Sequence, residues 1–378
     1  MLCAATTAAL VLGLGLPATA AELGGSGSEP SAAHSAAPRE SQASDSHASE
    51  LASSEAAQTK GARTPLATTE AKAPTARAKS ATAPTATARA VKIDAKISAA
   101  AARAKLGAAK GATASVKGGV RQNYARGAVF LKKGAKTAYA VRSGMLGRYR
   151  SAAGLPTGNE ACHGKNWCTQ PFSGSPRTLS WTSGKMRVCT GLRKRVEGKK
   201  ASALQVIEVD QTSTRHANVY ACVRDSNGTY KRDGGAYAGL VGKTGTAAKK
   251  REGDGKTPRG VYWMRGGFGT SKNPGLKHQR YTKVTKKTVW VDSSASKYYN
   301  TMRPSGKSEK LYQRGPYRHA QVIGYNEKRA KGKGSAIFLH RRTSASNYTM
   351  GCVAVYDSSL VKLMKWQISK DVQIAIHA

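Results

Sequence analysis

A histidine and a cysteine near the C-terminal end of the chain have the order and spacing of a base and its nucleophile. His340 ends the apolar run Ile337–His340, and Cys352 opens a second apolar run after the polar loop 341–348. Thiol chemistry requires a thiolate beside an imidazole, together with backbone N–H groups that bind the oxyanion of an acyl intermediate. The pattern therefore predicts acyl transfer through a cysteine at adjoining strand ends.

Gly351 fits the second of these requirements. Because glycine has no Cβ, a substrate carbonyl can approach the turn before Cys352, and we expect the N–H groups of Gly351 and Cys352 to bind the oxyanion. We expect His340 to take the thiol proton. An imidazolium lowers the pKa of a neighbouring thiol, so the sequence predicts that the pair can rest as an ion pair at neutral pH.

The sequence Thr349–Cys352, preceded by His340, resembles the catalytic domain of L,D-transpeptidases, the YkuD-type enzymes that cross-link peptidoglycan. Three further segments are similar to this family in the same order, at residues 251–264, 288–300 and 317–326. The resemblance covers roughly residue 200 to the end of the chain. It implies that the cysteine forms a thioester with a peptidoglycan stem peptide, without a metal or a cofactor.

The resemblance also implies roles for neighbouring residues. The backbone carbonyl next to the histidine, that of Arg341, would orient the ring, and Thr349 would support the turn. The fullest form of the family motif has a second histidine where this chain has Met350. We expect Arg341, Met350, Tyr325 and Asn326 to contribute to the substrate cleft.

Three other functions compete with cross-linking. An L,D-carboxypeptidase uses the same thioester with water as the acceptor. A cysteine peptidase of the papain kind places the cysteine before the histidine, which is the reverse of the order found here. A non-catalytic wall-binding or scaffold protein would explain the basic composition but not the pairing of His340 with Cys352.

Apolar runs of strand length recur after residue 200 and are bounded by turn residues, which predicts a mostly β domain. Residues 358–368 have a helical apolar period, with Ser358 or Ser359 as the expected N-cap, and residues 371–377 read as the last strand. We expect a β-sandwich or open barrel with one packing helix. The strand-length runs are 203–210, 217–225, 288–292, 320–326, 335–340 and 352–357.

The composition divides the chain before the catalytic domain into three parts. Residues 1–21 have an apolar core and small residues before a plausible cleavage point, which predicts a secretory signal. Residues 22–90 are rich in Ala, Ser, Thr and Pro, a composition that predicts a disordered tether. Residues 91–186 form a repeat region, and the catalytic domain is expected at 200–378, with no transmembrane span after the signal.

Two stretches of the repeat region look like copies of one unit. Gln122–Tyr124 aligns with Gln170–Phe172 at an offset of 48 residues (170 − 122), and a repeat of this period is a small packing module. The pattern, which includes Ala153–Pro156, is similar to LGFP repeats. That resemblance implies attachment to the cell envelope.

The chain is strongly basic, with 62 Lys and Arg against 21 Asp and Glu, a formal net charge of +41 and a pI near 10.3. A balance this basic predicts a polyanionic partner. The sequence has no zinc-finger spacing, RNA-binding aromatic signature or recognition-helix pattern, so we expect no nucleic acid partner. Export to the cell wall directs the expectation to anionic wall polymers, anionic glycans or phospholipid headgroups.

Cysteine arithmetic predicts two disulfides. If the signal carries Cys3 away, five cysteines remain in an oxidising compartment, and the count leaves Cys352 outside the disulfides, as a nucleophile must be. A metal site that includes His163 would need further ligands, so disulfides are favoured over metal binding. The expected pairs are Cys162 with Cys168 and Cys189 with Cys222.

Overall fold

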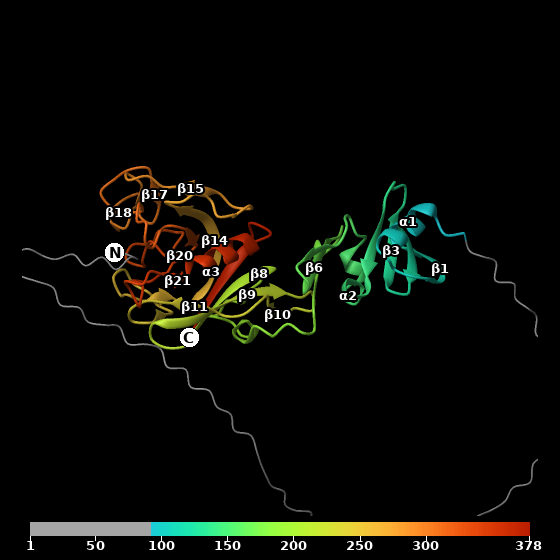
Figure 1. Ribbon diagram of the computed structural model, residues 1–378, viewed down its shortest axis with the longest axis horizontal. Helices are drawn as coiled ribbons and strands as arrows, with labels where there is room; N and C mark the ends of the chain where they lie inside the picture. The colour runs from blue at the N-terminus through green and yellow to red at the C-terminus, as the bar shows by residue number, and fades with distance from the viewer. Residues whose placement is uncertain (1–91) are drawn as a thin grey trace, which may run out of the picture. The chain divides into compact units, whose positions relative to one another are not determined.

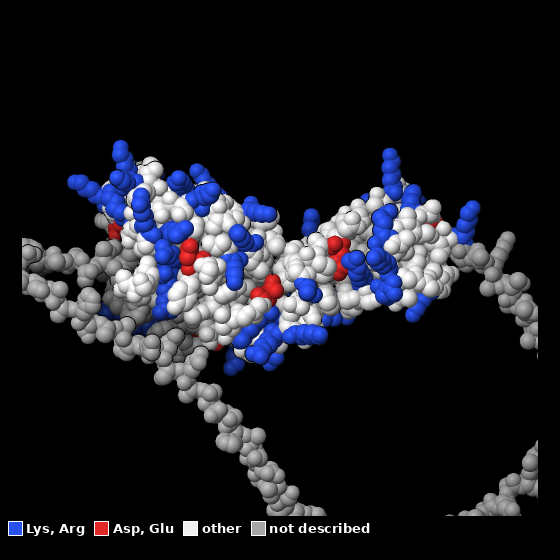
Figure 2. Space-filling model, in the orientation of Figure 1, with Lys and Arg blue, Asp and Glu red and all other residues white. Residues whose placement is uncertain are grey.

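The computed structural model describes residues 92–378, which form a mostly β protein (Figure 1). The predicted signal at 1–21 and tether at 22–90 lie outside the described residues. On the face drawn in Figure 2, Lys and Arg side chains are spread over the described parts of the chain, with few Asp and Glu among them. Within residues 92–378 no helix is both long and apolar enough to cross a membrane.

The region before residue 190 is built from two small antiparallel sheets. Helix α1 (Ala95–Arg103) precedes a four-stranded sheet, and α2 (Ser143–Leu146) precedes a three-stranded sheet. The first sheet contains β1 (Ala109–Val116), β2 (Gly119–Tyr124), β3 (Gly127–Lys132) and β4 (Ala138–Arg142). The second contains β5 (Ala161–His163), β6 (Trp167–Pro171) and β7 (Thr178–Thr182).

Two buried glutamines occupy corresponding places in these sheets. Gln122 on β2 and Gln170 on β6 are both fully buried, and each donates its side-chain amide to backbone carbonyls on other segments. A buried N–H group is stabilised by donating a hydrogen bond, so each glutamine ties its strand to neighbouring backbone through its side-chain nitrogen. These are the positions that the sequence aligns at a 48-residue offset; wall attachment by this region stays a prediction.

The rest of the chain forms a closed eight-stranded barrel. The strands follow the order β9-β11-β21-β20-β19-β14-β22-β8, and β8 pairs with β9 along seven residues, which closes the ring. This closure differs from the open barrel or sandwich expected from sequence. The barrel strands are β8 (Gln205–Gln211), β9 (His216–Arg224), β11 (Tyr237–Leu240), β14 (Gly260–Gly269), β19 (Ala320–Ile323), β20 (Phe338–Arg341), β21 (Val353–Val355) and β22 (Val372–His377).

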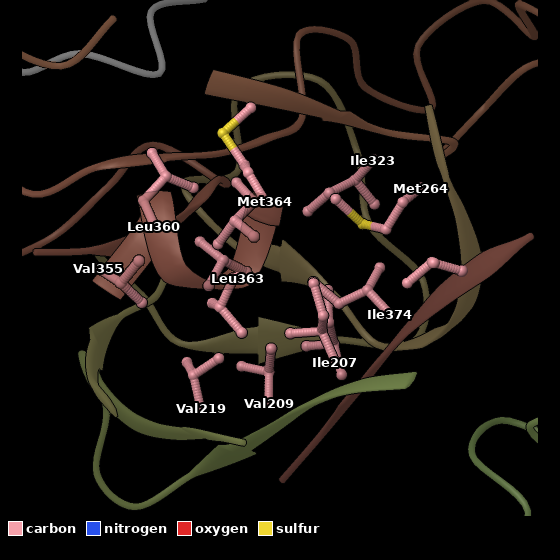
Figure 3. Close-up of a cluster of buried hydrophobic side chains, with 14 of the residues drawn as sticks. Ile207, Val209, Val219, Met264, Ile323, Val355, Leu360, Leu363, Met364 and Ile374 are labelled. Carbon is pink, nitrogen blue, oxygen red and sulfur yellow. The ribbon is translucent and has the colours of Figure 1, made fainter. Parts of the chain in front are cut away.

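Helix α3 (Asp357–Trp366) supplies part of the barrel core (Figure 3). Leu360, Leu363 and Met364 are fully buried and pack with apolar side chains of the barrel strands. The helix begins earlier than expected, because its N-cap is Tyr356 and makes no side-chain capping bond. Asp357 instead places a carboxylate in the first turn, where the helix dipole favours negative charge.

Shorter strands outside the ring complete the fold. A three-stranded sheet of β16, β17 and β18 lies between β14 and β19 in sequence, and its Trp290 packs against Phe338 with ring centroids 4.9 Å apart. Trp263 is 36% exposed and so does not belong to a core. The remaining bounds are β10 (Tyr230–Arg232), β12 (Thr246–Ala247), β13 (Thr257–Pro258), β15 (Tyr281–Lys283), β16 (Val289–Trp290), β17 (Met302–Arg303) and β18 (Glu309–Lys310).

The two predicted disulfides are present. Cys162 and Cys168 are directly opposite residues on β5 and β6, and their bond excludes the alternative of a metal site there. Cys189 and Cys222 connect the chain before a short 3-10 turn (Thr190–Arg193) to β9 of the barrel.

Candidate active site

Strands β20 and β21 bring His340 and Cys352 onto the same side of the sheet. The two strands are parallel neighbours, with His340 opposite Ala354 and Leu339 opposite Val353. This register sets Cys352, just before β21, level with Phe338, whose N–H lies 3.3 Å from the cysteine Sγ. Residues two apart along a strand share a face, so Phe338 and His340 project to the side that holds Cys352.

The opposite faces of these strands have different environments. Leu339, Val353 and Val355 point into the barrel core. Cys352 and Phe338 instead belong to an aromatic cluster that includes Phe268 and Tyr317. The alternation of side chains along a strand thus separates the candidate site from the core that supports it.

His340 is held as a specific tautomer. Its Nδ1 donates a hydrogen bond to the backbone carbonyl of Arg341 at 2.8 Å, so the proton resides on Nδ1. Nε2 is buried and has no hydrogen-bond partner among the described residues. The Arg341 carbonyl is the orienting group that the family resemblance implied, and Nε2 is left with a lone pair that can accept a proton.

Burial makes this imidazole a weakly basic, neutral group. His340 is 4% exposed, and burial lowers its pKa to about 4, against a smaller opposing effect of the hydrogen bond to Arg341. The sequence predicted a resting ion pair at neutral pH. In the present state His340 is neutral, because a buried imidazole cannot recover the hydration that its charged form would lose.

The cysteine sulfur is engaged in this structure. Cys352 is fully buried and disulfide-bonded, and its partner lies outside the described residues. Its Sγ also lies 3.3 Å from the carbonyl oxygen of Ala336. The prediction that Cys352 stays outside the disulfides is therefore wrong for this state of the chain. Thiol chemistry requires release of the sulfur.

The turn before Cys352 requires glycine. Gly351 has φ +139°, and a Cβ there would lie 3.0 Å from the carbonyl oxygen of Lys256 and 3.1 Å from Cδ1 of Ile337. The N–H of Gly351 donates to Oγ1 of Thr349 at 3.2 Å. In this state the N–H that we expected in the oxyanion site is used inside the turn.

Two threonine hydroxyls hold the backbone carbonyl of Cys352. Oγ1 of Thr349 donates to it at 2.6 Å, and Oγ1 of Thr257 donates at 3.0 Å while accepting from the N–H of Gly242 at 2.8 Å. The support of the turn by Thr349 agrees with its expected role. Thr257 was missed, since the sequence singled out residues 251–264 only as a segment similar to the family.

The segment before Thr257 is a turn held by Asp254, and it lies against the turn that contains Gly351. Asp254 accepts hydrogen bonds from the backbone N–H groups of Arg251 and Lys256 and from Nζ of Lys250. Burial alone would raise the pKa of Asp254, but these bonds outweigh it and lower the pKa. Cε of Lys250 lies 3.3 Å from the place that a Cβ on Gly351 would occupy.

Tyr317 is a second residue that sequence reasoning missed. Its ring lies edge-on to that of His340, with centroids 5.6 Å apart, and its hydroxyl donates to Oε1 of Glu309 at 2.5 Å. The residue is fully buried, and burial raises its pKa well above the ordinary value. A neutral phenol with a committed hydroxyl can hold the imidazole plane in place without exchanging a proton.

The four residues expected to contribute to the substrate cleft lie in different surroundings. Asn326 uses its side-chain amide to hold a loop, with bonds to Ala330 and Gly334. The hydroxyl of Tyr325 donates to the carbonyl of Lys333, and its half-buried ring lines a pocket described below. Met350 and Arg341 adjoin Gly351 and His340, and both side chains are partly exposed.

No known family profile and no curated protein matches this chain. Comparison with solved structures finds protein Bd1075 of Bdellovibrio bacteriovorus, with a TM-score of 0.28 and 18% sequence identity. The alignment spans 46% of this chain and 48% of that one, less than half of either protein. A likeness at this TM-score carries no argument about fold or function.

Proposed function

We propose that the protein is an exported L,D-transpeptidase that joins peptidoglycan stem peptides through a thioester on Cys352. The observation that best supports this is the state of His340, whose Nδ1 is bonded to Arg341 and whose Nε2 has no partner among the described residues. The sequence resemblance supplies the reaction class, and the neighbouring parallel strands supply a base and a sulfur on one face.

The first half-reaction would acylate the cysteine. Nε2 of His340 accepts the thiol proton, and the thiolate attacks the carbonyl of the diaminopimelate-type residue, where it is joined to the terminal D-residue of a tetrapeptide stem. A carbon–sulfur bond forms, the peptide carbon–nitrogen bond breaks, and the imidazolium returns its proton to the leaving amine of the terminal D-residue. The product is a thioester, and His340 is neutral again.

The second half-reaction would transfer the acyl group. An amine of a second stem attacks the thioester, its proton passes to His340, and the cysteine leaves as a thiolate that regains that proton. Water in place of the amine would give carboxypeptidase activity. The two outcomes share every protein group and differ in the acceptor.

Release of the Cys352 sulfur from its disulfide is a condition of this proposal. Exchange with a dithiol reductant, which is itself oxidised to a disulfide, returns the Cys352 thiol. The disulfides Cys162–Cys168 and Cys189–Cys222 suit an extracytoplasmic protein. A basic chain that acts in the wall would meet anionic wall polymers, which agrees with the net charge of +41.

Incubation with purified disaccharide-tetrapeptide under mild reduction tests the proposal. We expect a cross-linked dimer with loss of one terminal residue, read by mass spectrometry, and no dimer from the Cys352→Ala variant. Release of the terminal residue with a monomeric product only would identify the carboxypeptidase. Unchanged substrate with folded, reduced protein would contradict both enzymatic assignments.

A further inference from the structure

A pocket of about 740 Å³ lies beside the candidate active site, between the loop 248–251 and the loop 324–333. Lys250 connects the two places, because it lines the pocket while its Cε lies 3.3 Å from the position of a Cβ on Gly351. The backbone N–H of Glu252 donates to the carbonyl of Gly332 at 2.8 Å and joins the two loops. We call this cavity the lysine pocket.

Positive charge dominates its lining. Lys250 is paired with Asp254, and the one acidic residue of the lining, Glu327, is paired with Arg265. The other basic side chains have no ion pair within residues 92–378. They are Lys199, Lys249, Arg251, Lys328, Lys331 and Lys333. A concave surface lined by one sign of charge focuses the field and concentrates counter-ions.

The loop that carries three of these lysines is held in a fixed shape. Asn326, at φ +51°, accepts from the N–H of Ala330 and donates to the carbonyls of Ala330 and Gly334. Asn300 donates to the carbonyls of Tyr325 and Asn326. Since Lys and Arg are spread over the surface in Figure 2, charge alone does not mark a site. A fixed, concave arrangement of uncompensated like charges does.

We propose that the lysine pocket binds a phosphodiester polymer that lacks bases, of the polyol-phosphate type. Lysine binds phosphate as a point charge, without the fixed two-point geometry that arginine offers to phosphate and carboxylate alike. Six of the seven basic lining residues are lysines. Point charges of this kind suit phosphates that are spaced along a flexible polymer.

The aromatic residues of the pocket argue against a nucleic acid. Tyr262 and Tyr325 pack edge to face with centroids 5.5 Å apart, and their hydroxyls donate to the carbonyls of Arg259 and Lys333. Base stacking needs an open aromatic face. These two rings are partly buried against each other and the barrel core, so the pocket recognises the backbone charge alone.

The lysine pocket would hold an anionic wall polymer next to the catalytic turn. Polymer binding in the lysine pocket depends on charge and shape, and it does not require the Cys352 thiol. Loss of polymer binding and loss of cross-linking are therefore separate results, and either can fail without the other.

The test compares two charge-matched variants of the full chain. Lys328, Lys331 and Lys333, all exposed, are changed together to Gln in the pocket variant. The control variant changes three exposed lysines outside the pocket, Lys283, Lys286 and Lys287. Binding to poly(glycerol phosphate) and to a single-stranded oligodeoxynucleotide of equal charge is measured over a range of salt, after circular dichroism has shown that both variants are folded.

We expect the pocket variant to bind poly(glycerol phosphate) about tenfold more weakly than the control variant at low salt. The slope of log K against log salt should fall by about 2, because three contacts at about 0.7 each are lost. If both variants bound poly(glycerol phosphate) equally weakly, the binding would depend on general surface charge, and the proposal would be overturned. A larger pocket-dependent loss for the oligonucleotide would overturn it in favour of a nucleic acid site.

Discussion

At the scale of the residue, the proposed acyl transfer depends on how His340 is held. Burial removes the hydration of its charged form, and the Arg341 carbonyl fixes the proton on Nδ1. Burial keeps Nε2 unprotonated at pH values where an exposed histidine would be partly charged, although the Arg341 bond opposes this with a smaller rise in pKa. The buried state of His340 could not be read from the sequence, because it depends on the aromatic cluster brought in from distant segments.

The pH dependence of acylation should reflect this lowered pKa. His340 must be neutral to act as a base, and its pKa of about 4 lies below the ordinary value of about 6.5. The rate of Cys352 acylation by disaccharide-tetrapeptide in reduced protein should therefore persist near pH 5.5 and decline only at lower pH. A decline centred at pH 6.5 in stopped-flow or mass-detected acylation would contradict the burial argument.

Replacement of Gly351 should disable the turn. The Gly351→Ala variant brings a Cβ to 3.0 Å from the Lys256 carbonyl at φ +139°, and strain of this kind costs about 1–3 kcal/mol. We expect lower stability in urea unfolding and acylation reduced at least tenfold. Gly184→Ala is the matched control, because a Cβ at Gly184 meets nothing within 4 Å. Equal behaviour of the two variants would show that the close approach at Gly351 is unimportant.

At the scale of the element, the site is made by two parallel strands and a segment far away in sequence. The strand positions were largely predictable, since the apolar runs at 203–210, 217–225 and 371–377 correspond to β8, β9 and β22. The start of α3 and the closure of the barrel could not be predicted from the sequence. Closure depends on the register between β8 and β9, which no local pattern contains.

The two threonines that hold the Cys352 carbonyl should act together. Thr257→Val and Thr349→Val each remove one hydroxyl donor, at a cost of about 1 kcal/mol, and leave the other in place. The double variant leaves the buried carbonyl without either hydroxyl, so its destabilisation should exceed the sum of the two. Urea unfolding of the four proteins gives this double-mutant cycle. Additive changes would mean that the two hydroxyls are independent.

At the scale of the whole molecule, β22 completes the barrel and ends beside a buried carboxylate. Nε2 of His377 lies 3.3 Å from Oε1 of Glu208, which is 1% exposed, and Nδ1 lies 3.5 Å from Asp210. Burial alone would lower the pKa of His377, but the bond and charge of Glu208, with Asp210, outweigh it and raise the pKa. The ion pair between His377 and Glu208 thus joins β22 to β8, and it forms only when His377 is protonated.

This pair should make stability depend on pH. A histidine with a raised folded pKa contributes fully below its unfolded pKa of about 6.5, and the contribution is lost as pH rises through the folded pKa. The His377→Gln variant should therefore be less stable than the parent by about 1–2 kcal/mol near pH 5.5, with a smaller difference near pH 9. Urea unfolding at both pH values measures this, with the exposed His278→Gln as control. A constant difference would exclude linkage to His377.

Some features of the whole molecule could be predicted from the sequence, and others could not. The mostly β architecture and both described disulfides followed from apolar runs and cysteine counting. The disulfide state of Cys352, the clamp by Thr257 and the packing of Tyr317 on His340 did not. The clamp joins Thr257 to Cys352 and the packing joins Tyr317 to His340, and local residue patterns are insensitive to contacts across such separations.

Mapping of a trapped thioester tests the central claim most directly. Reduced protein is mixed with disaccharide-tetrapeptide, quenched in acid, and digested for peptide mass mapping. We expect an acyl adduct on Cys352, no adduct in Cys352→Ala, and formation slowed about 10²–10⁴-fold in His340→Ala at neutral pH. Raising the pH toward about 8.5 should restore part of that loss. An adduct on another residue, or acylation of His340→Ala at the parent rate, would contradict the account.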